Sequence, residues 1–345
     1  MDPIVLAIAT ALIALIFAFT NGVQDASATA ATMVASGAAS PRSAVVFAAL
    51  LGFTGAMLGG SAVAFTMQGM VDVPAGETLS EVLLAAVAGA TLWNVFTWRK
   101  GLPSSSTHSL VGGLAGAAAA GAGLNSVVWG LDELMAGQLT GLSKVILFLL
   151  ASVAAGFAGG YLIRKVSAIL LRPAGRGVTK HLLRGQWLTT GTLAFAHGAN
   201  DSQKQMGIIV LALVSAGAAA SADIPLWVRA SCAAMMFAGT IGGGWKIMRT
   251  LGRKIYPLRP LDGLDSQLTS ASSLLASTAL GAPVSSTQVV ASSVMGVGAA
   301  ENARMVQWGV GRHMIVSWFL TIPASALISA LILFILRSII GWGAL

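Results

Sequence analysis

Ten apolar segments separated by short polar stretches run through the chain of 345 residues. Only 9% of the residues are charged and 56% are hydrophobic, whereas a soluble globular protein carries about 25% charged residues. A helix needs about 20 predominantly apolar residues to cross a bilayer. The pattern therefore predicts an all-α polytopic membrane protein and excludes a soluble enzyme, a disordered chain and a coiled coil. The expected segments are 4–36, 43–67, 80–98, 101–123, 142–164, 186–218, 227–248, 262–280, 284–300 and 309–337.

Positive charges gather in alternate loops of the chain, which explains a net charge of +8 without a nucleic-acid partner. By the positive-inside rule these basic loops are cytoplasmic. We therefore expect both termini outside the cytoplasm, in a bacterial inner membrane. Asp2 is the only early charge, so the first segment lacks the basic region of a signal peptide and is predicted to remain as a membrane helix. The basic loops contain Arg42, Arg99, Lys100, Arg164, Lys165, Arg172, Arg176, Lys180, Arg184, Lys246, Arg249, Arg253, Lys254 and Arg259.

Two short motifs recur in the same order about half a chain apart. Residues 22–25 (Gly-Val-Gln-Asp) resemble residues 198–201 (Gly-Ala-Asn-Asp). Residues 103–108 (Pro-Ser-Ser-Ser-Thr-His) resemble residues 283–288 (Pro-Val-Ser-Ser-Thr-Gln). Two motifs with nearly the same offset indicate an internal duplication.

The position of the longest basic loop predicts that the duplicated halves are inverted. Five segments lie on each side of it, so the second half enters the membrane the other way up. We expect a first repeat over 1–165, a cytoplasmic linker over 166–185 and a second repeat over 186–345. Segments 101–123 and 284–300 are interrupted by Gly, Pro and Ser. They are predicted to form discontinuous helices and re-entrant hairpins.

Asp25 and Asp201 lie within apolar, small-residue sequence. A charge at bilayer depth costs about 2.5–3.5 kcal/mol on insertion scales, so such residues usually face a cavity lined by protein. Gly22 and Gly198 are expected to let the helices unwind nearby and expose backbone groups to an ion. The alternative is that both aspartates cap helices at the membrane surface.

The second motif places hydroxyl groups directly after a proline. At a helix start, unpaired N–H groups and a partial positive charge face outward. Hydroxyl groups add neutral donors there, which suits a tetrahedral oxyanion such as phosphate or sulfate. The alternative is a pair of helix contacts built from small residues. The hydroxyl residues are Ser105, Ser106 and Thr107, with Ser285, Ser286 and Thr287.

These motifs resemble those of the inorganic phosphate transporter (PiT) family, over about residues 17–337. The matching runs are Trp93–His108, His197–Asp201 and Gly281–Thr287. The resemblance implies an inverted-repeat fold with re-entrant hairpins and cation-coupled uptake of phosphate, or of sulfate in some members. It places substrate-binding residues at Gln24, Asp25, Asn200 and Asp201 and at the hydroxyl residues of both hairpins. The typical His of the second hairpin is Gln288 here.

Two departures from the family pattern concern the coupling ion. Where sodium-coupled members have Asn, this chain has Ala28 in the first half and Lys204 in the second. Ala lacks a ligating oxygen, and Lys supplies a cation of its own. Lys204 is three residues from Asp201, within pairing distance on a helix, although it could instead extend to the interface. The pattern resembles the low-affinity, proton-coupled bacterial branch.

The sequence therefore predicts a secondary symporter of inorganic phosphate and protons, without a cofactor or a bound metal. The chain has no GxxxxGK[ST] motif for ATP. Asp25 or Asp201 would carry the proton, with Lys204 next to Asp201, and His197 could relay protons or simply pack. Free phosphate and a metal–phosphate complex both remain open. A sulfate permease is the nearest alternative, and an intramembrane hydrolase using Ser105 or Ser106 with His108 is a distant one.

The partners expected are the bilayer, phosphate and protons. GxxxG motifs at residues 55–59 and 156–160 mark close helix contacts. Such motifs are common, so they leave a homodimer open without identifying its interface.

Overall fold

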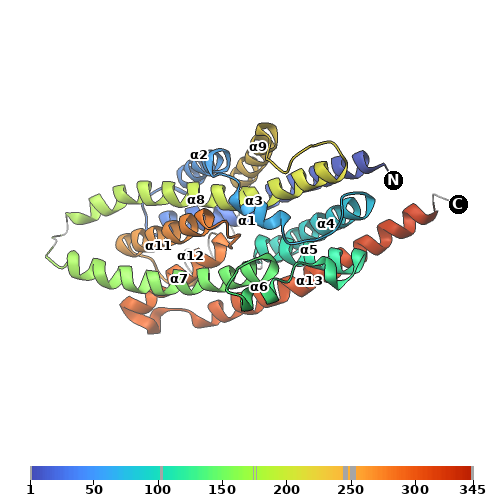
Figure 1. Cartoon of the computed structure of the whole chain (residues 1–345). Helices are drawn as coiled ribbons and strands as arrows, with labels where there is room; N and C mark the ends of the chain where they lie inside the picture. The colour runs from blue at the N-terminus through green and yellow to red at the C-terminus, as the bar shows by residue number, and fades with distance from the viewer. Residues whose placement is uncertain are drawn as a thin grey trace.

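The computed structural model describes residues 2–101, 104–173, 175, 177–243, 248 and 254–342, without the side chains of 26, 27 and 340–342. These residues fold into helices, and the one ladder pair among them is an isolated bridge between Val71 and Val127 (Figure 1). Residues Arg176, Lys246, Arg249 and Arg253 of the basic loops lie outside the described residues. The helices are α1 Pro3–Ala35, α2 Pro41–Leu58, α3 Ala62–Gln68, α4 Glu77–Lys100, α5 Ser106–Ala122, α6 Leu131–Met135, α7 Gly141–Leu170, α8 Val178–Ser215, α9 Leu226–Gly242, α11 Pro260–Ala279, α12 Ser286–Asn302 and α13 Trp308–Trp342.

Five of these helices are long and apolar enough to cross a membrane: α1, α2, α4, α7 and α13. This finding confirms the expectation of a helical membrane protein. The apolar segment 43–67 is two helices rather than one, because the chain turns at residues 59–61. Gly60 has a φ of 84° there, a conformation that ends a helix.

The centre of the molecule is formed by α1 and α8, which pack against each other. On the outer side, α9 packs on α1 and α2 packs on α8. On the opposite side, α13 covers the α4–α5 pair and α7 covers the α11–α12 pair. Figure 1 shows the turn between α7 and α8 at one end of the molecule and both termini at the other.

The expectation that α1 and α8 unwind at Gly22 and Gly198 is wrong. Both helices run without interruption through these residues. The glycines instead permit close helix packing: a Cβ on Gly198 would lie 1.9 Å from the carbonyl oxygen of Gly52 in α2, and one on Gly22 would lie 2.3 Å from that of Met236 in α9. The GxxxG glycines also pack within the chain, against α8 and α12.

The helical breaks occur instead between α4 and α5 and between α11 and α12. Gly101 follows α4 with a φ of 67°, and Gly281 follows α11 with a φ of 64°. Each glycine closes its helix in the left-handed conformation, and the chain then turns back to start a second helix at Ser106 or Ser286. The two hydroxyl motifs thus begin α5 and α12.

Candidate functional site

Asp25, in the middle of α1, lies where the starts of α5 and α12 meet. Its side chain is buried, and it accepts a hydrogen bond from Ser106 at 2.6 Å and another from Thr287. Ser106 belongs to the first hairpin and Thr287 to the second. One carboxylate therefore joins both hydroxyl motifs, across 262 residues of sequence in the case of Thr287.

Asp201, in the middle of α8, has a different set of partners. Ser286 donates to it at 2.9 Å, and Nδ1 of His197 lies 3.0 Å from the same carboxylate oxygen. The ammonium group of Lys204 forms an ion pair with the other oxygen. Asp201 thus has two basic neighbours within its own helix, whereas the contacts described for Asp25 come from hydroxyl groups.

Lys204 is completely buried and does not extend to the interface. Besides the Asp201 carboxylate, its ammonium donates to Thr107 Oγ1 at 2.6 Å and to the backbone oxygen of Val284 at 2.7 Å. Its three ligands are therefore a carboxylate, a hydroxyl and a carbonyl oxygen from three elements. The ammonium occupies the kind of oxygen-lined position that a small bound cation would take.

The tips of the two hairpins also contact each other directly. Thr107 donates to the Val284 oxygen at 2.9 Å. His108 and Gln288, which hold equivalent places in the two motifs, are 2.9 Å apart through Nδ1 and Nε2. Gln288, which stands where the family pattern has His, is therefore within hydrogen-bond distance of His108. The sequence did not predict this contact.

The amides of the acidic motifs hold backbone groups near the site. The side-chain amide of Gln24 donates to the backbone oxygen of Asn94. Asn200 donates to Thr278 and to the Ala282 oxygen, both at 3.0 Å, and accepts from the Val284 N–H at 3.2 Å. Asn200 thus fastens the turn between α11 and α12.

The sequence analysis missed two buried amides beside the first hairpin. Asn21 accepts from Ser106 at 3.2 Å and Asn94 accepts from Ser109 at 2.8 Å. The Nδ2 group of each is buried and has no hydrogen-bond partner among the described residues. Asn21 precedes Asp25 by four residues, as His197 precedes Asp201. The internal repeat therefore places Asn21 at the position equivalent to His197, and this equivalence could have identified it as a site residue.

A comparison with protein families identifies the chain. The model of the phosphate transporter family matches residues 21–174 and again residues 172–329. The chain belongs to the phosphate transporter family. A relative from Bacillus subtilis, named "Probable low-affinity inorganic phosphate transporter", is 38% identical over 97% of this chain and 98% of the relative. One of the same name from Rhizobium meliloti is 38% identical over 93% of this chain and 94% of the relative.

A solved structure described as "The sodium-dependent phosphate transporter" has the same fold. The TM-score is 0.87 with 24% sequence identity, over 97% of this chain and all of the other. Membership of the phosphate transporter family confirms the expected resemblance. It also shows a transporter rather than an intramembrane hydrolase.

Proposed function

We propose that this chain takes up inorganic phosphate by symport and binds it where the starts of α5 and α12 meet. The observation that supports this most is the convergence of two hydroxyl-bearing helix starts on the buried carboxylate of Asp25, with α12 also bonded to Asp201 through Ser286. Helix starts and hydroxyls offer neutral donors to an oxyanion. The proposed substrate ligands are Gln24, Asp25, Ser105, Ser106, Thr107, Asn200, Asp201, Ser285, Ser286 and Thr287. To these we add Asn21 and Asn94, whose free N–H groups lie beside the first tip.

Phosphate fits this site better than sulfate does. Phosphate retains a proton at neutral pH and can donate a hydrogen bond to a carboxylate, whereas sulfate is a dianion with acceptors only. A site with two buried carboxylates therefore repels sulfate and gains a contact with phosphate. The relatives named as phosphate transporters support the same choice.

We propose protons as the coupling ion. Sodium needs oxygen ligands with net negative charge, but the oxygen cage beside Asp201 already holds the ammonium of Lys204. The equivalent position near Asp25 has Ala28, which has no ligand to offer. The hydrogen bonds described for Asp25 come from hydroxyl groups, whereas Asp201 is ion-paired with Lys204, so Asp25 is the better proton carrier.

The two halves are proposed to form an inverted repeat. The family model matches twice, with the division near residues 172–174. This division falls within the linker 166–185 that separates repeats 1–165 and 186–345. In Figure 1, α1 starts at the end that holds the termini and α8 starts at the opposite end. The hairpins α4–α5 and α11–α12 then enter the membrane from opposite sides as re-entrant elements.

The proposed orientation puts the α7–α8 turn in the cytoplasm of a bacterium and both termini outside. A cysteine at Arg172, which is exposed at this turn, tests it in a Cys232→Ser background. Cys232 is buried and is the natural cysteine of the chain, so its replacement leaves the introduced cysteine as the labelling site. Arg172→Cys should resist a membrane-impermeant thiol reagent in intact cells and react after lysis. Labelling in intact cells would reverse the orientation.

Uptake of radiolabelled phosphate into proteoliposomes tests the function. A proton gradient should drive uptake without sodium, and excess sulfate should compete weakly. Assays with and without Mg²⁺ separate free phosphate from a metal–phosphate complex. The double variant Ser105→Ala/Ser285→Ala should abolish uptake, because a buried anion loses about 1.5–3 kcal/mol with each charged hydrogen bond. Thr54→Ala, which removes an exposed hydroxyl bonded within α2, is the matched control. Normal uptake by the double variant would place the substrate elsewhere.

A further inference from the structure

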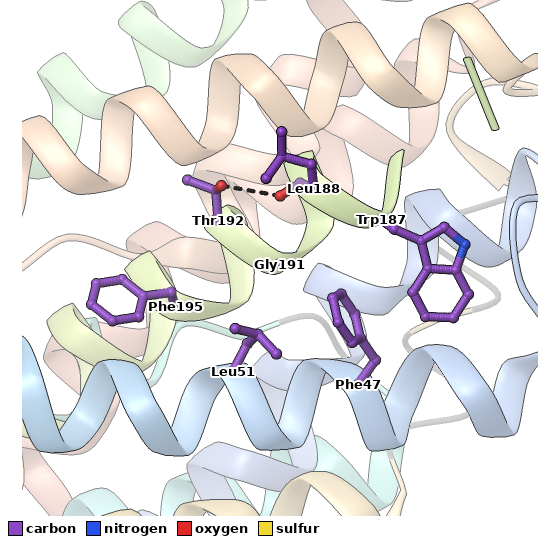
Figure 2. A pocket seen from close by; sticks show the side chains of 7 residues that line it. All are labelled: Phe47, Leu51, Trp187, Leu188, Gly191, Thr192 and Phe195. Atoms are coloured by element: carbon purple, nitrogen blue, oxygen red, sulfur yellow. Dashed lines mark hydrogen bonds between the residues drawn. The ribbon is translucent and has the colours of Figure 1, made fainter. Parts of the chain in front are cut away.

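A groove of about 500 Å³ opens between α2 and α8 on the outside of the molecule (Figure 2). Phe47 and Leu51 of α2 form one wall, and Trp187, Leu188 and Phe195 of α8 form the other. The rings of Phe47 and Trp187 meet edge to face with centroids 5.0 Å apart. The hydroxyl of Thr192 donates to the backbone oxygen of Leu188 at 3.0 Å, so it is already satisfied within α8. The groove therefore presents an apolar surface.

The floor of this groove exists because residue 191 is glycine. A Cβ at Gly191 would lie 3.1 Å from the ring of Phe47, so a side chain there would fill the space between the helices. Leu188 is 76% exposed and Trp187 is 37% exposed. In a membrane protein, these side chains face lipid rather than water.

One end of the groove is strongly basic. Lys180, Arg184 and Leu188 follow one another at four-residue spacing, so they lie on one face of α8. Arg42 lies in the first turn of α2, at the same end, because Gly52 and Gly55 of α2 pack beside Ala194 and Phe195 of α8. All three cations are exposed, and none forms an ion pair among the described residues.

The two helices that form the groove offer these cations no counter-charge, and Asp262 and Asp265 of the neighbouring α11 are buried beside Arg164. Neither α2 nor the part of α8 before Asp201 contains an acidic residue. An unpaired basic cluster at the mouth of an apolar groove matches a molecule with an anionic head and an apolar tail. Such basic pockets between transmembrane helices are typical of sites for anionic lipid headgroups.

We propose that this groove binds one anionic phospholipid. One acyl chain lies along Phe47, Leu51 and Phe195, and the phosphate contacts Arg184 and Lys180. The indole of Trp187 lies where the chain meets the headgroup, the usual depth of tryptophan in membrane proteins.

Charge favours this lipid over a second copy of the chain. A two-fold dimer places the same patch of both copies face to face. Such packing would bring Arg42, Lys180 and Arg184 of one copy near those of the other, without acidic residues to compensate. A phospholipid neutralises these charges instead.

Bromine on an acyl chain quenches tryptophan fluorescence on contact, so Trp187 can report the lipid directly. The full chain in detergent is titrated with dibrominated phosphatidylglycerol or dibrominated phosphatidylcholine. The difference between the wild-type chain and Trp187→Phe isolates the signal of Trp187 from the other eight tryptophans. We expect half-maximal quenching by the anionic lipid at a concentration at least fivefold lower than by the neutral lipid.

The double variant Lys180→Gln/Arg184→Gln should remove this preference. Arg312→Gln, an exposed cation on α13, is the control and should preserve it. Equal quenching by both lipids in the wild-type chain would show non-specific lipid contact and overturn the proposal. Protection from both lipids, together with cross-linking of Leu188→Cys between copies, would overturn it in favour of a dimer.

Discussion

At the scale of single residues, Lys204 is the side chain that most distinguishes this site from one that binds sodium. The variant Lys204→Ala removes the ammonium group and leaves three oxygen ligands, from Asp201, Thr107 and the Val284 backbone, around an empty space. The carboxylate of Asp201 then remains buried without this ion pair. Removing one partner of a buried ion pair costs about 3–5 kcal/mol, so the variant should melt well below the wild-type chain. Sodium should fill the cage and restore part of this loss.

The measurement is thermal unfolding in detergent, in sodium chloride against choline chloride at equal ionic strength. Sodium should raise the melting temperature of Lys204→Ala and leave that of the wild-type chain unchanged. Lys204→Arg keeps the positive charge and is the control, with no sodium response. If sodium stabilises all three proteins equally, the ammonium does not stand in for a bound cation.

Asp25 supports a second prediction at the same scale. Asp25→Asn keeps an oxygen that can accept from Ser106 or Thr287 but cannot gain and lose a proton. Proton-driven phosphate uptake should therefore fall to background. Exchange of internal for external phosphate needs no net proton movement and should retain a substantial part of its rate. Equal loss of both activities in a folded variant would make Asp25 a substrate ligand alone.

At the scale of elements, the two hydroxyl motifs start helices with different caps. Ser105 accepts a hydrogen bond from the His108 N–H at 3.2 Å, whereas Ser285 makes no side-chain bond as N-cap of α12. Loss of a serine cap costs about 0.5–2 kcal/mol. Ser105→Ala should therefore lower stability by about 1 kcal/mol and speed amide hydrogen exchange in the first turn of α5. Ser285→Ala should leave the first turn of α12 unchanged, and equal effects would contradict the assigned caps.

Much of the helical arrangement follows from the sequence, because apolar length and the Pro–Ser motifs predict spans and hairpins. The errors arose where one residue type has two physical uses. The sequence pattern at Gly22 and Gly198 predicts unwinding, but in packed helices glycine equally permits close backbone approach. The break at Gly60 was missed because hydropathy does not register a positive φ.

The candidate site was predictable as a set of residues and not as a network. The repeat indicated both aspartates and both hydroxyl motifs, since equivalent residues resemble each other. Ser106–Asp25 and Ser286–Asp201 stay within one repeat, but other contacts cross between repeats, as in Thr287 with Asp25 or His108 with Gln288. A comparison of each residue with its own counterpart does not reveal such crossed pairs.

At the scale of the whole molecule, ion pairs link neighbouring helices at both ends, on either side of the buried site. Near the α7–α8 turn, Arg164 contacts Asp262 at 3.0 Å and Glu301 at 2.6 Å. Near the termini, Arg337 contacts Glu81 at 2.8 Å and the Gly121 oxygen at 3.2 Å. Each arginine thus joins a long outer helix to both limbs of one hairpin, α11–α12 or α4–α5.

The two ends differ in how deeply their charges are buried. The Arg164 side chain is 8% exposed and that of Asp262 is fully buried, whereas Arg337 is 38% exposed. Arg164→Gln leaves Asp262 and Glu301 paired with Arg259 but removes the described ion-pair partner of the buried Asp265. The change should cost about 3–5 kcal/mol. Arg337→Gln breaks a pair whose arginine is 38% exposed but whose Glu81 side chain is 8% exposed, so it should cost less, about 1–3 kcal/mol. Thermal unfolding should rank the variants in this order, and hydrogen exchange should rise only at the end that lost its arginine.

Low pH should destabilise the helix packing at the end near the α7–α8 turn. Hydrogen bonding to Arg259, 2.6 Å away, lowers the pKa of Glu301 below its ordinary value. A carboxylate with a lowered pKa adds stability above its unfolded pKa, and this stability is lost as the pH falls through the folded pKa. Exchange near the α7–α8 turn should therefore rise in the wild-type chain as the pH falls below the ordinary glutamate pKa of 4.5. The variant Glu301→Gln has no charge to lose. Its hydrogen exchange at this end should therefore be raised already at neutral pH and should change less as the pH falls. If the exchange of Glu301→Gln responds to acid as the wild-type chain does, another carboxylate is responsible for the effect.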